Sequence, residues 1–527
     1  MRRWNGWGDD TTSYRLRPGG LRFLETQVGP GRPARDATLA DVTRTVPSSR
    51  LPRHTLASSE AADRVRHARG QSLPDWVALR SGRVGAFPDG VAYPASRDEV
   101  RELLRFAVEA GVTAIPYGGG TSVVGHVNPG PEPTLTIDLS RLNRLLRFDD
   151  RGCLATFGAG VSGPDLEAQL RARGFTLGHF PQSFEYSTLG GWVATRSSGQ
   201  QSLGYGRIED LFAGGVLEAP AGTLALPAFP ASAAGPDLRE VVLGSEGRLG
   251  ILTEATVRMV PLPQVEAFHA VFLPDWERAQ AAARQIVQAG LHLSMLRLST
   301  APETEATLAL AGHERLIGAL EQYLALRRVG QGKCMLLLGV TGRESLVRAA
   351  RREALAIAGS HGGVHVGRIF GQEWRKNRFR LPYLRNTLWD LGYAIDTLET
   401  ATTWDAVPAM VADIEEALRG ATAEPGERVH VFTHLSHLYP HGSSIYATYV
   451  FPLGVTPDDM LAQWLRLKRA ASEAIVRKGG TISHQHGVGT DHAPYLLAEK
   501  GELGMAAIRE TCRVFDPRGL MNTGKLV

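Results

Sequence analysis

The sequence predicts an α+β fold of at least two domains, and two patterns carry this prediction. Glycine-rich stretches follow short β-type runs in the N-terminal half, the first at residues 116–125. Strands then alternate with amphipathic helices between residues 267 and 358, which is typical of sheet and helix packed in layers. A length of 527 residues also exceeds what one hydrophobic core supports, so two or three domains are expected.

The composition excludes several classes of function. The 58 Lys and Arg residues nearly balance the 54 Asp and Glu residues. Because the small positive excess forms no basic block, a nucleic-acid partner is not indicated. The three cysteines, Cys153, Cys334 and Cys512, are far apart and read as reduced thiols of a cytoplasmic protein. No apolar run approaches the roughly 18 residues of a membrane span, so we expect a soluble protein with at most peripheral membrane contact.

The first glycine-rich stretch reads PYGGGTSVVG and occupies residues 116–125. It follows a strand at residues 112–115, which comes after a strand at 91–93 and a helix that begins at a capping box of Ser96 and Glu99. Glycines leave successive backbone N–H groups open to surround an anion. We therefore expect a pyrophosphate here. The spacing is not GxGxxG, which disfavours a Rossmann domain.

Two further stretches have the same character. Residues 181–206 are rich in glycine and hydroxyl side chains and poor in charge, which suits a large polar ligand with aromatic parts. Residues 244–255 read GSEGRLGILTEA and predict a tight turn that feeds an alternating strand. Strands at residues 134–139 and 155–161 and a helix at 164–173 are expected between the first and second stretches.

The second half of the chain predicts an antiparallel sheet with helices on one face. Its expected strands are 267–273, 294–298, 334–340, 429–434 and 444–451, and its expected helices are 277–289, 314–328, 344–358 and 457–478. Residues 1–80 predict irregular structure and short helices, anchored by Trp4 and Trp7. The expected divisions are 1–83, 84–263, 264–479 and 480–527, the last returning to the nucleotide site.

Six motifs together resemble the vanillyl-alcohol-oxidase superfamily of FAD proteins, and within it the alkylglycerone-phosphate synthase family. They are WNGWG at 4–8, PYGGGTS at 116–122, PQSFEYSTLGGWVATR at 181–196, GSEGRLG at 244–250, YLR at 383–385 and SHQHGVG at 483–489. The resemblance implies a PCMH-type FAD-binding domain of two subdomains and an α/β cap domain with an antiparallel sheet. A homodimer is also expected.

The resemblance implies that FAD is bound through all three glycine-rich loops. The implied contacts are Pro116, Tyr117, Gly118, Gly119, Gly120, Thr121 and Ser122; Pro181, Gln182, Ser183, Phe184, Glu185, Tyr186 and Ser187; Ala194, Thr195, Arg196 and Ser197; and Glu246, Gly247, Arg248, Leu249, Gly250, Ile251 and Leu252. Superfamily members often bind flavin covalently through a histidine near the first loop, where this chain has His126. The synthase family resembles the non-covalent members, and non-covalent FAD is expected.

The implied reaction exchanges the acyl chain of acyl-dihydroxyacetone phosphate for a fatty alcohol without net oxidation. Tyr446 matches the proton-transfer tyrosine of the family, and Arg385 matches the arginine that binds the substrate phosphate. Arg297 matches another arginine important in the family. Tyr449 lies three residues beyond Tyr446 and faces the other way in a strand, so it is the weaker candidate.

The histidine motif near the C-terminus departs from the family pattern. The family has three consecutive histidines, whereas this chain has His484, Gln485 and His486. If the segment is a strand, both histidines share one face and reach one site. A metal site involving the histidines is the rival interpretation, but the Gly and Asp residues of the metal-binding hydroxyacid dehydrogenases are missing here, and no metal is expected.

Two other functions remain open from the sequence. The alternative enzyme is an FAD-dependent oxidoreductase that acts on a 2-hydroxyacid or an alcohol. The other is a flavoprotein without catalysis that binds lipid or a partner.

Overall fold

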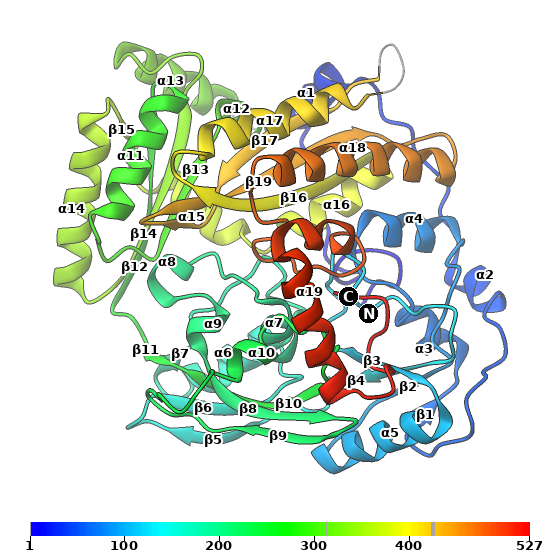
Figure 1. Cartoon of the computed structure of the whole chain (residues 1–527). Coiled ribbons are helices and arrows are strands. Elements are labelled where there is room, and N and C mark those ends of the chain that lie inside the picture. The colour runs from blue at the N-terminus through cyan, green and yellow to red at the C-terminus, as the bar shows by residue number, and fades with distance from the viewer. Residues whose placement is uncertain (1, 312–313, 423–426) are drawn as a thin grey trace.

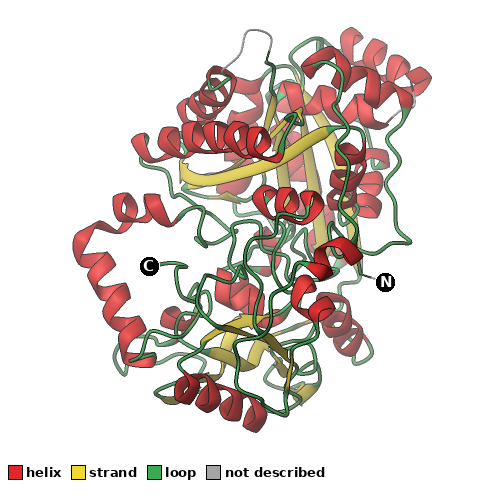
Figure 2. Cartoon of the chain, turned by 90° about the vertical axis from the view of Figure 1, so that its right-hand side faces the viewer, coloured by secondary structure: helices red, strands yellow, loops and turns green. Residues whose placement is uncertain are grey.

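The computed structural model describes residues 2–311, 314–422 and 427–527. It contains a four-stranded, a five-stranded and an eight-stranded sheet and a two-stranded ribbon. The two smaller sheets lie at one end of the molecule and the eight-stranded sheet at the other (Figure 1). The C-terminal helix α19 (Leu496–Phe515) runs along one side from the large sheet's domain to the smaller sheets (Figure 2). The expected α+β architecture of two domains is confirmed.

The N-terminal segment is rich in loops and packs against both ends of the molecule. Trp7 is buried in the core of the large domain, and Trp4 packs on a small core around Val42. Trp7 therefore anchors the segment to the large domain, as the sequence suggested, whereas Trp4 packs mainly on residues of the segment itself. Its helices are α1 (Pro18–Val28), α2 (Leu39–Arg44), α3 (Ala61–Arg66) and α4 (Leu73–Ser81).

The four-stranded sheet leads the chain into the first glycine-rich loop. Its parallel strands run in the order β2, β4, β3, with β1 antiparallel at the edge. Helix α5 begins after Ser96, whose hydroxyl accepts the Glu99 N–H, and ends at Gly111 in the left-handed region. The Glu99 carboxylate accepts from Ala95 instead of closing the expected capping box. The elements are β1 (Ala57–Ser58), β2 (Gly90–Ala92), α5 (Arg97–Ala110), β3 (Thr113–Tyr117) and β4 (Thr134–Asp138).

The five-stranded sheet is antiparallel and carries the second and third loops. Short helices between its strands share one core with it, built around Phe157, Trp192 and Phe212. Its strands, in spatial order, are β5 (Leu145–Asp149), β6 (Leu154–Gly158), β10 (Ile251–Arg258), β8 (Phe212–Ala219) and β9 (Gly222–Leu226), and β7 (Phe175–Thr176) pairs with β11 (Val260–Pro261). The helices are α6 (Gly163–Arg171), α7 (Leu189–Thr195), α8 (Ser202–Tyr205), α9 (Ile208–Leu211) and α10 (Arg239–Val242).

The eight-stranded sheet is antiparallel throughout, as expected. Its longest pairing joins β16 to β19, and β16 was not predicted. The order is β15 (Val364–His365), β12 (Val265–Leu273), β14 (Cys334–Gly342), β13 (Met295–Ser299), β17 (His430–Leu435), β19 (Gly442–Pro452) and β16 (Tyr393–Thr403), with β18 (Leu438–Tyr439) beside β19.

Helices cover both faces of this sheet, so the expectation of helices on one face was wrong. Alternate residues of β12 enter two different cores, Val271 on one side and Phe272 on the other. The side of Val271 carries α11 (Trp276–Gln288), α14 (Glu344–Ser360), α17 (Val407–Gly420) and α18 (Pro457–Arg477). The side of Phe272 carries α12 (Ala301–Ala311), α13 (Glu314–Leu326) and α15 (Ile369–Asn377). Helix α16 (Leu381–Asp390) follows α15 and packs through Leu384 and Leu388 in a separate core with Val450.

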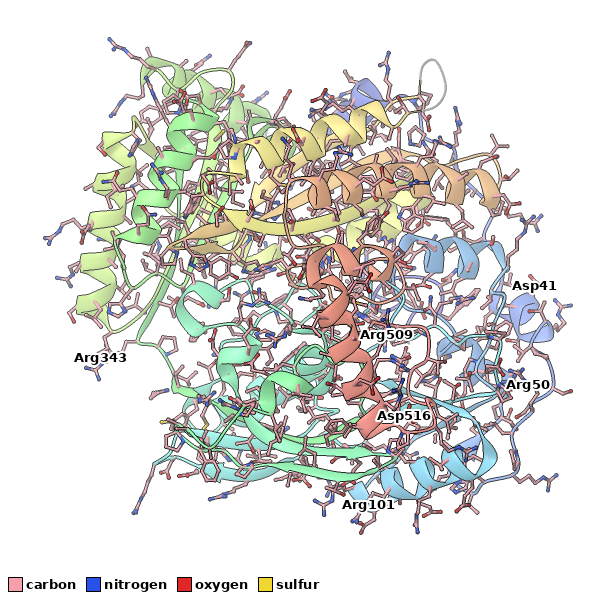
Figure 3. The ribbon with its side chains drawn as sticks, viewed as in Figure 1. Asp41, Arg50, Arg101, Arg343, Arg509 and Asp516 are labelled. Carbon is pink, nitrogen blue, oxygen red and sulfur yellow. The ribbon has the colours of Figure 1, made fainter. Side chains whose placement is uncertain are left out.

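The last residues of the chain return to the first glycine-rich loop. After α18 and a short 3-10 helix (Ala493–Tyr495), α19 ends at Asp516 (Figure 3), whose carboxylate accepts the Met521 N–H at 2.6 Å. Ala114 on β3 then exchanges backbone hydrogen bonds with Leu520 and Asn522, both at 2.9 Å. The C-terminus therefore lies against the strand that opens the nucleotide site.

Candidate active site

One cavity of about 490 Å³ connects the three glycine-rich loops with the large sheet. Its floor is formed by the loops, and its opposite wall by side chains from α12, α16, β13, β17 and β19. The cavity lining includes most of the residues that the sequence proposed for catalysis, namely Arg297, Arg385, Tyr446 and His486.

Glycines let the three loops touch one another. A Cβ atom on Gly118 would lie 2.3 Å from the Thr188 hydroxyl, and one on Gly119 would lie 1.9 Å from the Tyr186 carbonyl oxygen. These contacts join the first loop to the second. The glycines therefore set the distance between loops, in addition to shaping the anion site that the sequence predicted.

The first loop presents a row of unused backbone donors. None of the N–H groups of residues 118–122 donates to an acceptor among the residues that the structure describes. Gly120 adopts a φ of +60° at the centre of this row. Unsatisfied N–H groups that converge in a cavity are suited to a pyrophosphate, so this loop fits the predicted FAD.

Glu246 in the third loop holds the C-terminal segment against the nucleotide site. Its carboxylate is buried and accepts the N–H groups of Val488 at 2.5 Å and Gly489 at 2.8 Å. It also lies 3.1 Å from Nε2 of His126, whose Nδ1 is 2.8 Å from the Ser122 hydroxyl. Glu246 lines the cavity, but its carboxylate oxygens are occupied mainly by these contacts within the protein.

The cavity lining differs in detail from the predicted FAD contacts. Phe184, Leu249 and Ile251 lie in hydrophobic cores, Arg196 pairs with Glu240, and Arg248 donates to the Met521 carbonyl. Glu185 and Tyr186 are also absent from the lining. The other predicted contacts line it. The sequence analysis missed Trp7, Gln71, Gly190, Gly191, Trp192 and Asn522, which line it too; of these, Trp7, Gly190, Gly191 and Trp192 belong to motifs quoted above.

Tyr446 lies on β19 between two histidine rings. The His434 ring stacks on it with centroids 5.0 Å apart, and the His486 ring meets it edge-on at 5.7 Å. Its hydroxyl donates to Oγ1 of Thr397 at 3.1 Å. Burial raises the pKa of Tyr446, and the Glu399 and Asp396 carboxylates raise it further. The phenol is therefore protonated at neutral pH. Tyr449 points to the opposite core, as expected.

Arg297 is half-buried and belongs to a group of three charged or ionisable side chains with the buried Glu303 and His434. Its Nη2 donates to Oε1 of Glu303 at 2.6 Å, and the same oxygen lies 3.0 Å from Nδ1 of His434. Despite the desolvation cost of burial, His434 and Arg297 lower the pKa of Glu303 to about 2. The carboxylate thus fixes Arg297 and the histidine that stacks on Tyr446. The sequence analysis did not identify Glu303.

Arg385 is half-buried, and most of its donors have no partner among the described residues. Its Nη1 donates to the Gln71 carbonyl, and its guanidinium lies 4.4 Å from the centre of the Trp76 ring. Nε and Nη2 are buried and have no partner among the described residues. Burial lowers the pKa of Arg385. A planar cation with two adjacent unused donors is suited to an anion that accepts two hydrogen bonds, such as a phosphate.

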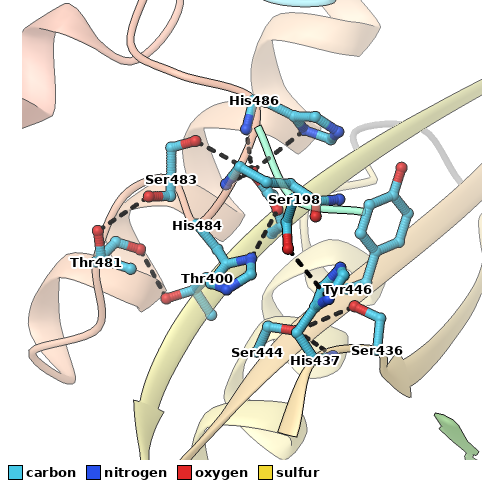
Figure 4. A network of polar contacts seen from close by, with 12 residues as sticks. Ser198, Thr400, Ser436, His437, Ser444, Tyr446, Thr481, Ser483, His484 and His486 are labelled. Atoms are coloured by element: carbon cyan, nitrogen blue, oxygen red, sulfur yellow. Dashed lines mark hydrogen bonds and ion pairs between the residues drawn. The ribbon is translucent and has the colours of Figure 1, made fainter. Parts of the chain in front are cut away.

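The two histidines of the C-terminal motif face different surroundings, because residues 483–489 form a loop and not the strand considered from the sequence. The buried Glu399 carboxylate shapes this loop by accepting the N–H groups of Gln485 and His486, each at 2.7 Å. His486 lines the cavity beside Tyr446. His484 does not; its Nε2 lies 2.6 Å from Nη1 of Arg207, and its ring stacks on His437 (Figure 4).

His437 is a further cavity residue that the sequence did not single out for catalysis. Its Nδ1 lies 2.9 Å from the Ser202 hydroxyl and 3.2 Å from the Ser198 hydroxyl. Burial lowers the pKa of His437 to about 3, so the ring is neutral. Across residues 2–311, 314–422 and 427–527, no three His, Cys, Asp or Glu side chains gather in a way that could hold a metal ion. Within the same residues, no helix is long and apolar enough to cross a membrane.

Comparison with known proteins agrees with this geometry. Residues 88–225 match the family model described as "FAD binding domain", and residues 262–526 match "FAD linked oxidases, C-terminal domain". The chain is 32% identical over 473 residues to alkyldihydroxyacetonephosphate synthase of Dictyostelium discoideum, covering 88% of this chain and 77% of that protein.

The chain belongs to the alkyldihydroxyacetonephosphate synthase family. The synthase of Trypanosoma brucei brucei is 31% identical over 480 residues, covering 89% of this chain and 78% of that protein. A solved structure of alkyldihydroxyacetonephosphate synthase superposes with a TM-score of 0.84 at 28% identity, covering 99% of this chain and 98% of the other. FAD is the cofactor, and the expected pairing of an FAD-binding domain with a sheet-containing C-terminal domain is confirmed.

Proposed function

We propose that the protein exchanges the acyl chain of acyl-dihydroxyacetone phosphate for a long-chain alcohol and so makes an ether-lipid precursor. One observation carries the proposal beyond family membership. Arg385 offers unused donors for a phosphate in the same cavity as Tyr446 and the FAD loops. A hydroxyacid oxidoreductase needs no such phosphate site.

The overall reaction balances without an oxidant. The bond between C1 and the acyl oxygen breaks, and its electron pair leaves with the fatty acid as a carboxylate. The alcohol oxygen ends on C1, and the hydroxyl proton of the alcohol is released. The resemblance to the synthase family implies that FAD, when bound, would supply ring nitrogen N5 as the atom that takes up C1. The side chains of the cavity have the tasks of holding the substrate and moving protons.

Arg385 binds the phosphate, and Tyr446 transfers the proton at C1. The protons on C1 are acidic because the carbon lies next to a carbonyl group. Tyr446 is protonated at rest, and burial lowers the pKa of His486, which keeps the imidazole beside it neutral. Arg297 and Glu303 keep His434 against the other side of the tyrosine ring.

The alkyl and acyl chains need an apolar part of the cavity. Met295, Leu310, Trp374 and Leu381 supply such a lining on the side of α12 and α15. We place the chains there. His126 is held between Ser122 and Glu246, which supports FAD bound without a covalent link. A homodimer, a cytoplasmic location and peripheral contact with the membrane that contains the lipid substrates remain predictions.

The test is a transfer assay with the yellow holoenzyme. Acyl-dihydroxyacetone phosphate and a long-chain alcohol should yield the alkyl product and free fatty acid in equal amounts, with the visible flavin spectrum unchanged after turnover. FAD-replete protein that forms neither product contradicts the proposal. Bleaching of the flavin by a 2-hydroxyacid without oxygen would favour the oxidoreductase instead.

A further inference from the structure

Three arginines line the cavity in the described part of the chain, and they differ in their charge partners. Arg297 is neutralised by Glu303 at 2.6 Å. Arg385 and Arg378 have no carboxylate within ion-pair distance among the described residues. A buried cation without a counter-ion is costly. The phosphate accounts for Arg385, and Arg378 has no assigned role.

Arg378 is held rigidly at the junction between α15 and α16. Its guanidinium lies 4.6 Å from the centre of the Phe180 ring and 4.7 Å from that of the Phe379 ring. The Trp374 ring, which lines the cavity, is 5.7 Å away. Aromatic contacts of this kind fix the plane of an arginine and hold it as a cation–π partner.

Most of the hydrogen-bonding capacity of Arg378 is unused. Its Nη1 donates to Oε1 of Gln201 at 2.8 Å. Nε and Nη2 have no acceptor among the described residues, although the residue is only 9% exposed. Burial lowers the pKa of Arg378 to about 10, so the group still carries its charge at neutral pH. The cavity therefore holds a second, preoriented site for an anion.

We propose that Arg378 binds the carboxylate of the fatty acid, the group that leaves when the acyl chain is exchanged. The identity of this ligand as a fatty-acid carboxylate rests on the proposed function. The substrate of that reaction has one permanent anion, the phosphate, and acquires a second when the bond from C1 to the acyl oxygen breaks. Two unpaired arginines in one cavity match these two anions. Arg378 stabilises the charge that develops on the leaving oxygen, and the apolar side of the cavity takes its chain.

Direct binding to the holoenzyme tests this assignment. Dodecanoate, dodecanol and dihydroxyacetone phosphate serve as probes, and binding is followed by the perturbation of the flavin spectrum. Arg378→Met should weaken dodecanoate binding at least about tenfold, the scale of a lost charge-assisted hydrogen bond. It should leave dodecanol and dihydroxyacetone phosphate unaffected. Arg385→Met should have the opposite effect and weaken the binding of dihydroxyacetone phosphate only.

Lys376→Met is the matched control, because it removes one exposed positive charge two residues away, outside the cavity. The assignment is wrong if Arg378→Met weakens the binding of dodecanoate no more than Lys376→Met does. It is also wrong if Arg378→Met weakens the binding of dodecanol as much as that of dodecanoate. If Arg378→Met loses FAD, a binding measurement on the unaltered protein still tests the assignment. Dodecanoate and dihydroxyacetone phosphate should bind together, since each has its own arginine, and mutual exclusion would refute separate sites.

The two proposals fail in different ways. If the holoenzyme binds dodecanoate through Arg378 but exchanges no acyl chain, the proposed transfer is wrong and the carboxylate site stands. If chain exchange proceeds and Arg378→Met binds dodecanoate normally, the transfer stands and the carboxylate site is wrong.

Discussion

The imidazole of His434 lies nearly parallel to the phenol ring of Tyr446, with the two planes 22° apart and the centroids 5.0 Å apart. Among the described residues, the tyrosine hydroxyl makes one hydrogen bond, to Thr397. Tyr446→Phe therefore keeps the ring contacts and removes only the group that moves a proton. Turnover in the transfer assay should fall at least about a hundredfold, the scale of a positioned acid or base, while FAD content stays normal.

Tyr449→Phe is the matched control for that variant. Tyr449 lies on the same strand but on the opposite face, where its hydroxyl donates to Asp396 at 3.1 Å. Asp396 keeps its bond from the Trp464 indole at 2.6 Å. The change should cost about 1 kcal/mol of stability with little effect on turnover. Equal losses in the two variants would remove Tyr446 from the proton transfer.

Glu303→Gln tests the group that supports the tyrosine. The amide keeps the shape of the side chain but leaves the half-buried Arg297 without its counter-ion and weakens the hold on His434. We expect kcat to fall about tenfold or more, with KM for the phosphate substrate much less affected because Arg385 is untouched. Steady-state kinetics separate the two constants. A rise in KM with unchanged kcat would mean that Glu303 acts on substrate binding instead.

Gly119→Ala tests the contact between the first and second loops. The added methyl group would lie 1.9 Å from the Tyr186 carbonyl oxygen, so the backbone must move. The purified variant should contain little FAD and recover little when FAD is added. Gly130→Ala is the control, because nothing lies within 4 Å of its added Cβ. Normal FAD content in Gly119→Ala would show that the loops tolerate a wider separation.

The glycine-rich loops were the part of the site that the sequence predicted best. Their composition predicts an anion cradle because the requirement for free N–H groups and close approach is local to the backbone. The three loops and the two catalytic candidates Tyr446 and Arg385 do line one cavity. Local patterns also located α5 and the long helix α18 to within a residue or two.

The contacts that depend on tertiary structure were not predictable. Glu303 reads as an ordinary acid in the first turn of a helix, and its meeting with Arg297 and His434 arises only when α12 packs on the sheet. The alternation of His484 and His486 suggested one shared site, but Glu399 on the unpredicted strand β16 binds the loop and turns the rings apart. The helix expected at 314–328 is present as α13, but its position on the second face of the sheet was not predicted. The nearly continuous apolar runs of β12 and β14 are typical of strands covered on both faces, a signal that the expectation of helices on one face did not use.

Asp491 should make the free energy of unfolding fall as the pH rises. An acid that is ion-paired in the folded state has the opposite effect. Burial raises the pKa of Asp491 from 3.8 to about 6, with Asp396 and Asp75 adding to the effect and Lys468 opposing it. A carboxyl group whose pKa is higher in the folded state stabilises the fold while it is protonated. That contribution is complete below the pKa of the unfolded chain and is lost as the pH rises through about 6.

Asp491→Asn should therefore gain stability relative to the unaltered protein as the pH rises from about 4 to about 8, by at most about 3 kcal/mol. Its melting temperature, compared with that of the unaltered holoenzyme at each pH, should rise across this interval. Asp458→Asn removes an exposed carboxylate and should give a difference that varies much less. A melting-temperature difference for Asp491→Asn that is constant with pH would mean that this carboxyl group is ionised in the folded protein at every pH tested, with Lys468 outweighing the cost of burial.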